Sequence, residues 1–60
     1  MSRKTYIEAA AILAGERALA RDDHERRTID NIARSLADMF KQDNGRFDRQ
    51  RFYAACGMEE

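Results

Sequence analysis

A chain of 60 residues is long enough for one small domain, because folding at this length buries only about 60% of the surface that the unfolded chain exposes. Eleven basic and eleven acidic residues cancel, so the chain lacks the positive field that attracts nucleic acid or anionic membranes. The single cysteine, Cys56, excludes an internal disulfide bond, and the apolar run at 9–14 is too short to cross a membrane. We therefore predict one intracellular, non-membrane domain spanning 1–60.

The first predicted helix begins near Thr5 and ends at about Ala20. Thr5 and Glu8 have the spacing of a capping box, in which two side chains satisfy backbone N–H groups at a helix start. Frequent alanines favour the helix through their intrinsic propensity. The expected apolar face consists of Tyr6, Ala9, Ala10, Leu13 and Ala20, continued around the side by Ile7, Ala11, Ala14 and Ala18.

Ile12 and Leu19 fall outside that face. They are seven residues apart, so they lie on one line of the helix, beside Glu8 and Glu16. One interpretation is that they are ordinary exposed apolar residues or that they cover the third helix. The other is that they form a contact surface for a second copy or for a partner protein.

Eight polar residues at 21–28 separate the first apolar pattern from a second one with a different phase. Asp22 and Glu25 form a second possible capping box, which places a tight connection near 21–23 and an antiparallel second helix after it. A single long helix that pairs with a second copy is the alternative. The buried stripe expected on the second helix consists of Ile29, Ile32, Ala33, Leu36, Met39 and Phe40.

The second helix is predicted to end at Gly45, in the left-handed conformation that glycine adopts readily. Asp48 then has the position of an N-cap for a short helix at about 49–56, and Phe47 and Phe52 have the spacing of a hydrophobic staple. Gly57 would end this helix and let Met58 fold back onto Tyr53. The expected fold is therefore all-α, a helical hairpin plus a short C-terminal helix.

Catalytic chemistry has little support in the sequence. His24 and Cys56 lie far apart, and no glycine-rich loop or serine elbow accompanies them. We interpret His24 as a solvated connector residue and Cys56 as a small core or capping residue. The segment at 43–48 lacks the ligand spacing of a calcium loop. We therefore predict no catalytic, cofactor-binding or metal-binding residues.

Arg46, Arg49 and Arg51 crowd the start of the third helix. They are candidates for a polar contact with an acidic partner protein. Alternatively, the second helix, the turn and the third helix form a helix-turn-helix that binds DNA. The short third helix and the zero net charge make nucleic-acid binding the weaker hypothesis.

The segment FDRQRFYAACG, at 47–57, resembles the end of a group of small proteins of tailed bacteriophages and prophages, which has the form F-D-x-x-R-F-x-x-A-C-G. This resemblance implies a phage-type origin and action in the cytoplasm of a bacterial host. Small phage accessory proteins commonly bind a host or defence protein and inhibit it. We therefore expect a non-enzymatic protein that acts by protein–protein binding, as a homodimer. Its candidate contact residues are Ile12, Leu19, Arg46, Arg49 and Arg51, and a structural subunit of a larger particle is a further alternative.

Overall fold

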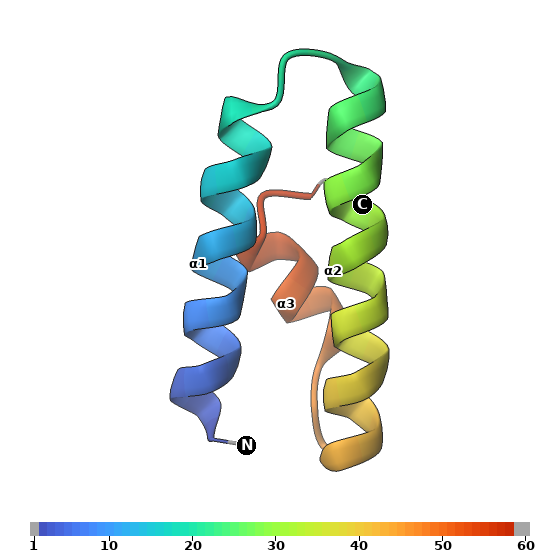
Figure 1. Cartoon of the computed structure of the whole chain (residues 1–60). Helices are drawn as coiled ribbons and strands as arrows, with labels where there is room; N and C mark the ends of the chain where they lie inside the picture. Colours follow the sequence, from blue (N-terminus) through green and yellow to red (C-terminus); the bar gives the residue numbers. More distant parts are fainter. Residues whose placement is uncertain (1, 59–60) are drawn as a thin grey trace.

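Two long helices and one short helix form the chain in the computed structural model, which describes residues 2–58 (Figure 1). The helices are α1 (Arg3–Leu19), α2 (Asp23–Asp43) and α3 (Arg49–Ala55). This arrangement confirms the predicted all-α hairpin with a short third helix. Residues 1, 59 and 60, which the expected 1–60 domain also includes, lie outside the described residues. Within 2–58, none of the helices has both the length and the apolar composition needed to cross a bilayer.

The start of α1 differs from the prediction. Ser2, not Thr5, is the N-cap, and its Oγ accepts a hydrogen bond from the Thr5 backbone N–H at 3.4 Å. The predicted capping box of Thr5 and Glu8 is therefore wrong. Because serine is itself a preferred N-cap residue, the helix begins two residues earlier, at Arg3.

The connection between α1 and α2 follows the prediction. Asp22 caps α2 by accepting a hydrogen bond from the Glu25 backbone N–H at 2.9 Å, and the Glu25 carboxylate accepts one from the Arg21 backbone N–H at 2.6 Å. The chain reverses direction here, and α1 and α2 lie side by side in antiparallel orientation (Figure 1). The alternative of a single long helix is therefore wrong.

The end of α2 uses a lysine instead of a left-handed glycine. Gly57 is the only residue with positive φ in the described range 2–58, so the left-handed conformation expected at Gly45 is wrong. The Lys41 ammonium group donates hydrogen bonds to the carbonyl oxygens of Gly45, at 2.6 Å, and Phe47, at 3.3 Å. These two bonds, together with the extended backbone of Asn44, turn the chain toward α3.

Both ends of α3 are capped as predicted. Asp48 accepts a hydrogen bond from the Arg51 backbone N–H at 3.1 Å, and the ring centroids of Phe47 and Phe52 lie 5.6 Å apart. At the other end, the Met58 N–H bonds the Tyr53 carbonyl and the Gly57 N–H bonds the Ala54 carbonyl. These two bonds define a Schellman motif, and Met58 is buried in the core with Tyr53.

The positive φ of Gly57 makes it a sensitive position. With φ at 84°, Gly57→Ala should lower the free energy of unfolding by about 1–2 kcal/mol, because a side chain is strained in the left-handed region. Gly45→Ala is a matched control. Neither glycine has an atom within 4 Å of an added Cβ, but Gly45 has no positive φ. Urea titration of both variants measures the difference, and equal stabilities would contradict the assigned role of Gly57.

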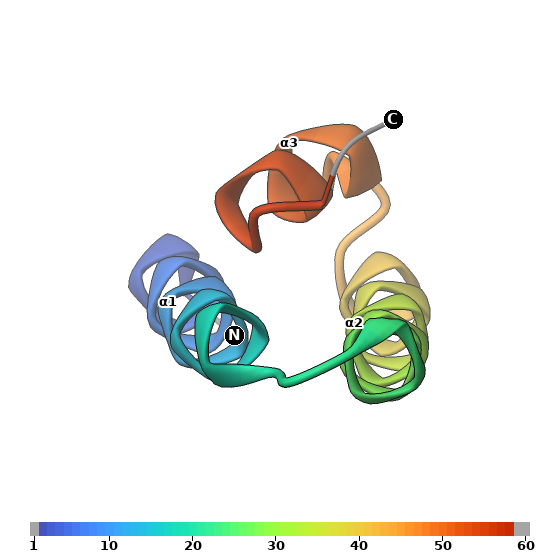
Figure 2. The same cartoon turned by 90° about the horizontal axis from the view of Figure 1, so that it is seen from above.

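The hydrophobic core lies between α3 and the hairpin. Figure 2 shows α3 on one side of the plane formed by α1 and α2, with no helix on the other side. Tyr6 from α1 lies 4.8 Å from both Phe40 and Phe47, and Phe40 lies 5.5 Å from Phe52, all measured between ring centroids. An aromatic cluster from three segments of the chain therefore holds α3 on the hairpin.

The buried faces of the long helices are narrower than the sequence predicted. On α2, Ala37 is fully buried although it was not assigned to the stripe, whereas Ile32 and Met39 are 48% and 46% exposed. On α1, the expected continuation of the apolar face is wrong at three positions, because Ile7, Ala11 and Ala18 are exposed. The reason is geometric, since a helix of 7 residues covers only one side of the hairpin.

Candidate protein-binding surfaces

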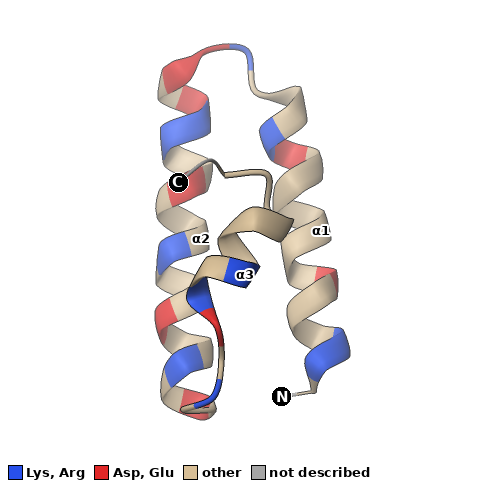
Figure 3. Cartoon of the chain, turned by 180° about the vertical axis from the view of Figure 1, so that it is seen from behind, with Lys and Arg blue, Asp and Glu red and all other residues tan. Residues whose placement is uncertain are grey.

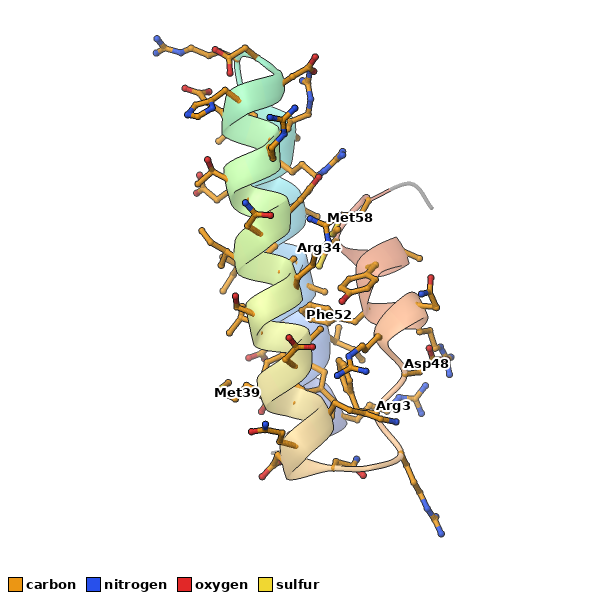
Figure 4. The ribbon with its side chains drawn as sticks, turned by 90° about the vertical axis from the view of Figure 1, so that its right-hand side faces the viewer. Arg3, Arg34, Met39, Asp48, Phe52 and Met58 are labelled. Carbon is orange, nitrogen blue, oxygen red and sulfur yellow. The ribbon has the colours of Figure 1, made fainter. Side chains whose placement is uncertain are left out.

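Apolar side chains occupy the side of the hairpin that α3 leaves uncovered. In Figure 4, Met39 points away from α3, on the opposite side of α2. Ile32 lies seven residues earlier, and two turns of an α-helix bring it onto nearly the same line. Both are about half exposed, and the half-buried Ile29 and Leu36 lie beside them on the wheel. α2 therefore presents an apolar strip to the uncovered side.

α1 contributes Ile12 and Leu19 to the same side. Ala10 lies against α3 and is buried, and Ile12 is turned about 200° around the helix from it. Ile12 and Leu19 are 68% and 75% exposed. They do not cover α3, which was one interpretation of these residues. We call Ile12, Leu19, Ile32 and Met39 together the hairpin face.

The three arginines singled out from the sequence do not form one cluster. Arg49 turns toward α2, where its guanidinium lies 3.0 Å from the Asp38 carboxylate. Arg46 and Arg51 line a pocket between α1 and α3 instead, together with Arg3 of α1. Figure 4 shows Arg3 on the same side of the molecule as α3. The fold thus places Arg3 beside Arg46 and Arg51, whereas Arg49 pairs with α2 and lines a second hollow with Arg46.

This pocket has a volume of about 380 Å³ and combines a basic rim with an apolar lining. We call it the arginine pocket. Its rim carries Arg3, Arg46 and Arg51, and its apolar lining is formed by Tyr6, Ile7, Ala10, Phe47, Phe52 and Ala55. Figure 3 shows the basic start of α1 and the basic segment before α3 at the same end of the molecule.

Tyr6 also carries an unpaired polar atom. Its hydroxyl oxygen is buried and has no hydrogen-bond partner among residues 2–58. A buried hydroxyl without a partner costs free energy of folding. The apolar contacts of the ring with Phe40 and Phe47 outweigh this cost and keep Tyr6 in the core.

An ion pair joins the long helices near the other end of the core. The Arg17 guanidinium lies 2.9 Å from the Asp30 carboxylate, and both side chains are largely buried. Cys56 is 1% exposed. Burial raises the pKa of its thiol, and the charge of Asp30 raises it further. The thiol is therefore protonated and shielded, which agrees with the core role predicted for Cys56.

No cluster of three metal-ligating side chains occurs in the described part of the chain. His24 is exposed in the first turn of α2. The chain matches no family model, no curated protein and no solved structure. The two surfaces are therefore interpreted from their own chemistry.

The sequence predicted some residues of the hairpin face and some of the arginine pocket. Ile12 and Leu19 were recognisable because they break the apolar pattern of α1, and the structure leaves both exposed. Ile32 and Met39 were missed because their spacing is that of a buried stripe. Arg3 was missed because it is far in sequence from Arg46 and Arg51, and only the packing of α1 against α3 brings the three to one pocket.

Proposed function

We propose that the protein is a non-enzymatic accessory protein of phage type that acts by protein–protein binding. The observation that carries this proposal is the hairpin face, with four large apolar side chains that remain about half to three-quarters exposed. Several large apolar side chains left exposed on one face are typical of contact sites in small proteins. The phage-type C-terminal segment supports a role in the cytoplasm of a bacterial host, against a host or defence protein.

A second copy of the chain fits the hairpin face. Two hairpins related by a two-fold axis can place the same residues of both copies in contact and form a four-helix bundle. Removing the exposed part of each large apolar side chain from water contributes about 1–2 kcal/mol. This gain matters for a chain of 60 residues, whose own core is small.

The double substitution Ile12→Glu and Leu19→Glu tests the pairing of two copies. The wild type should have twice the mass of one chain in sedimentation equilibrium, and the double variant should have the mass of one chain. Helicity measured by circular dichroism should stay nearly unchanged, because both positions are exposed. Carboxylates buried across an interface without partners are strongly unfavourable.

Ile7→Glu is the matched control for this experiment. Ile7 is also on α1 and is 59% exposed, but it lines the arginine pocket on the side of α3. Its substitution should leave the mass unchanged. A wild type that sediments as a single chain at high concentration would contradict pairing through the hairpin face.

Affinity capture from a bacterial lysate, with and without nuclease, tests the wider function. The wild type should retain one dominant protein after nuclease treatment, and the double variant should lose it. Ala11→Glu, at an exposed position of α1 outside both surfaces, should retain it. Capture that disappears with nuclease would favour the DNA-binding alternative, for which Arg49 and Arg51 are both exposed.

A further inference from the structure

We propose that the arginine pocket binds an acidic segment of a protein that inserts one apolar side chain. This site lies on the side of the hairpin that carries α3, opposite the hairpin face (Figure 4). Binding of a ligand to this pocket therefore does not depend on whether two copies of the chain pair. The charge and the lining of the pocket both fit an acidic peptide.

The charge of the rim is the first argument. Arg3, Arg46 and Arg51 contribute three guanidinium groups, and Asp48 is the one acidic residue among the described residues of the lining. Asp48 already accepts the hydrogen bond that caps α3. None of the three guanidinium groups has a hydrogen-bond or ion-pair partner within residues 2–58. Arginine binds carboxylates through paired N–H donors, so an acidic ligand satisfies these groups.

The lining of the pocket is the second argument. Ile7 is 59% exposed there, and the rings of Phe47 and Phe52 also contribute to the lining. A volume of about 380 Å³ is at the small end of the range for ligand pockets, which is about 300–1,000 Å³. It accommodates a large apolar side chain with its flanking backbone. A free inorganic anion would leave this apolar surface exposed.

The overall charge of the chain argues against a polyanion. Nucleic acid is held mainly by the attraction of many phosphates to a strongly basic surface. Here the net charge is zero, and Arg49, which lines a second hollow with Arg46, already pairs with Asp38. The three unpaired guanidinium groups of the pocket rim therefore suit a few carboxylates close to one apolar side chain better than a long run of phosphates.

Two-dimensional NMR of the isotope-labelled full chain tests this site. The probe is a short synthetic peptide with a central leucine flanked by glutamates, and a second peptide carries glutamine in place of each glutamate. The acidic peptide should shift the backbone amides of Ile7, Phe47 and Ala55 in a saturable manner. The glutamine peptide should bind at least about tenfold more weakly.

Arg46→Gln combined with Arg51→Gln removes two of the rim charges. Both residues are exposed, so the fold should be preserved, and affinity for the acidic peptide should fall about tenfold. Arg27→Gln is the matched control, because Arg27 is exposed on α2 outside the pocket lining. It should bind like the wild type.

Three results would overturn the proposal. The first is an absence of shifts at the pocket amides with millimolar peptide. The second is equal binding by the wild type and the double glutamine variant. The third is saturable binding of inorganic phosphate or a short single-stranded DNA to the same amides while the acidic peptide has no effect. Each is distinguishable from a failure of pairing through the hairpin face, which is measured by mass.

Discussion

Phe40→Ala should remove most of the stability of the protein. Phe40 is 2% exposed and contacts the rings of Tyr6, Phe47 and Phe52. Truncation of a buried phenylalanine costs about 3–5 kcal/mol, because apolar contacts are lost and a cavity remains. A chain of 60 residues is expected to have a free energy of unfolding of about 3–9 kcal/mol. Urea titration followed by circular dichroism should therefore show a much earlier transition or a largely unfolded variant.

Met39→Ala is the control for this prediction. Met39 precedes Phe40 on the same helix but is 46% exposed and points away from α3. Measured in the unpaired background of Ile12→Glu and Leu19→Glu, where the hairpin face contributes nothing, its truncation should cost no more than about 1 kcal/mol, since alanine also has the higher helix propensity. Similar losses for the two variants would contradict a core centred on the ring of Phe40.

Tyr6→Phe should stabilise the protein. The substitution removes a buried hydroxyl that has no partner among residues 2–58 and keeps the ring contacts with Phe40 and Phe47. An unsatisfied buried polar group costs about 1–3 kcal/mol, so the free energy of unfolding should rise by up to that amount. The urea midpoint should increase with an unchanged slope of the transition.

Tyr53→Phe is the matched control. Of the two tyrosine hydroxyl groups, only that of Tyr6 is buried without a hydrogen-bond partner among residues 2–58. Its stability should stay within about 0.5 kcal/mol of the wild type. A loss of stability in Tyr6→Phe would show that the Tyr6 hydroxyl makes a favourable hydrogen bond in solution.

The distribution of residues on α2 shows why local patterns predict burial only in part. Ile29, Ala33, Leu36 and Phe40 belong to the predicted stripe and lie in or against the core. Ile32 and Met39 have the same spacing but remain about half exposed. Periodicity identifies an apolar face, but the width of its buried part depends on how much of it the neighbouring helices cover.

The ends of the helices also include some features that the local sequence predicts and others that it does not. Asp22 and Asp48 were recognisable as caps, because capping is local and depends on a few neighbouring residues. The turn after Asn44 was not, because Lys41 reaches forward to the carbonyl oxygens of Gly45 and Phe47. A flexible lysine side chain leaves no sequence pattern that predicts this contact.

The sequence by itself determined the helices, most of their caps, the staple of Phe47 and Phe52, and the Schellman motif at Gly57. These features depend on interactions within a few residues. Only the tertiary structure decided that α3 covers one side of the hairpin and leaves Ile12, Leu19, Ile32 and Met39 uncovered. It also brought Arg3 to Arg46 and Arg51. Contacts between distant segments arise from packing, because the length of α3 and the aromatic cluster beneath it set where α1 and α3 meet.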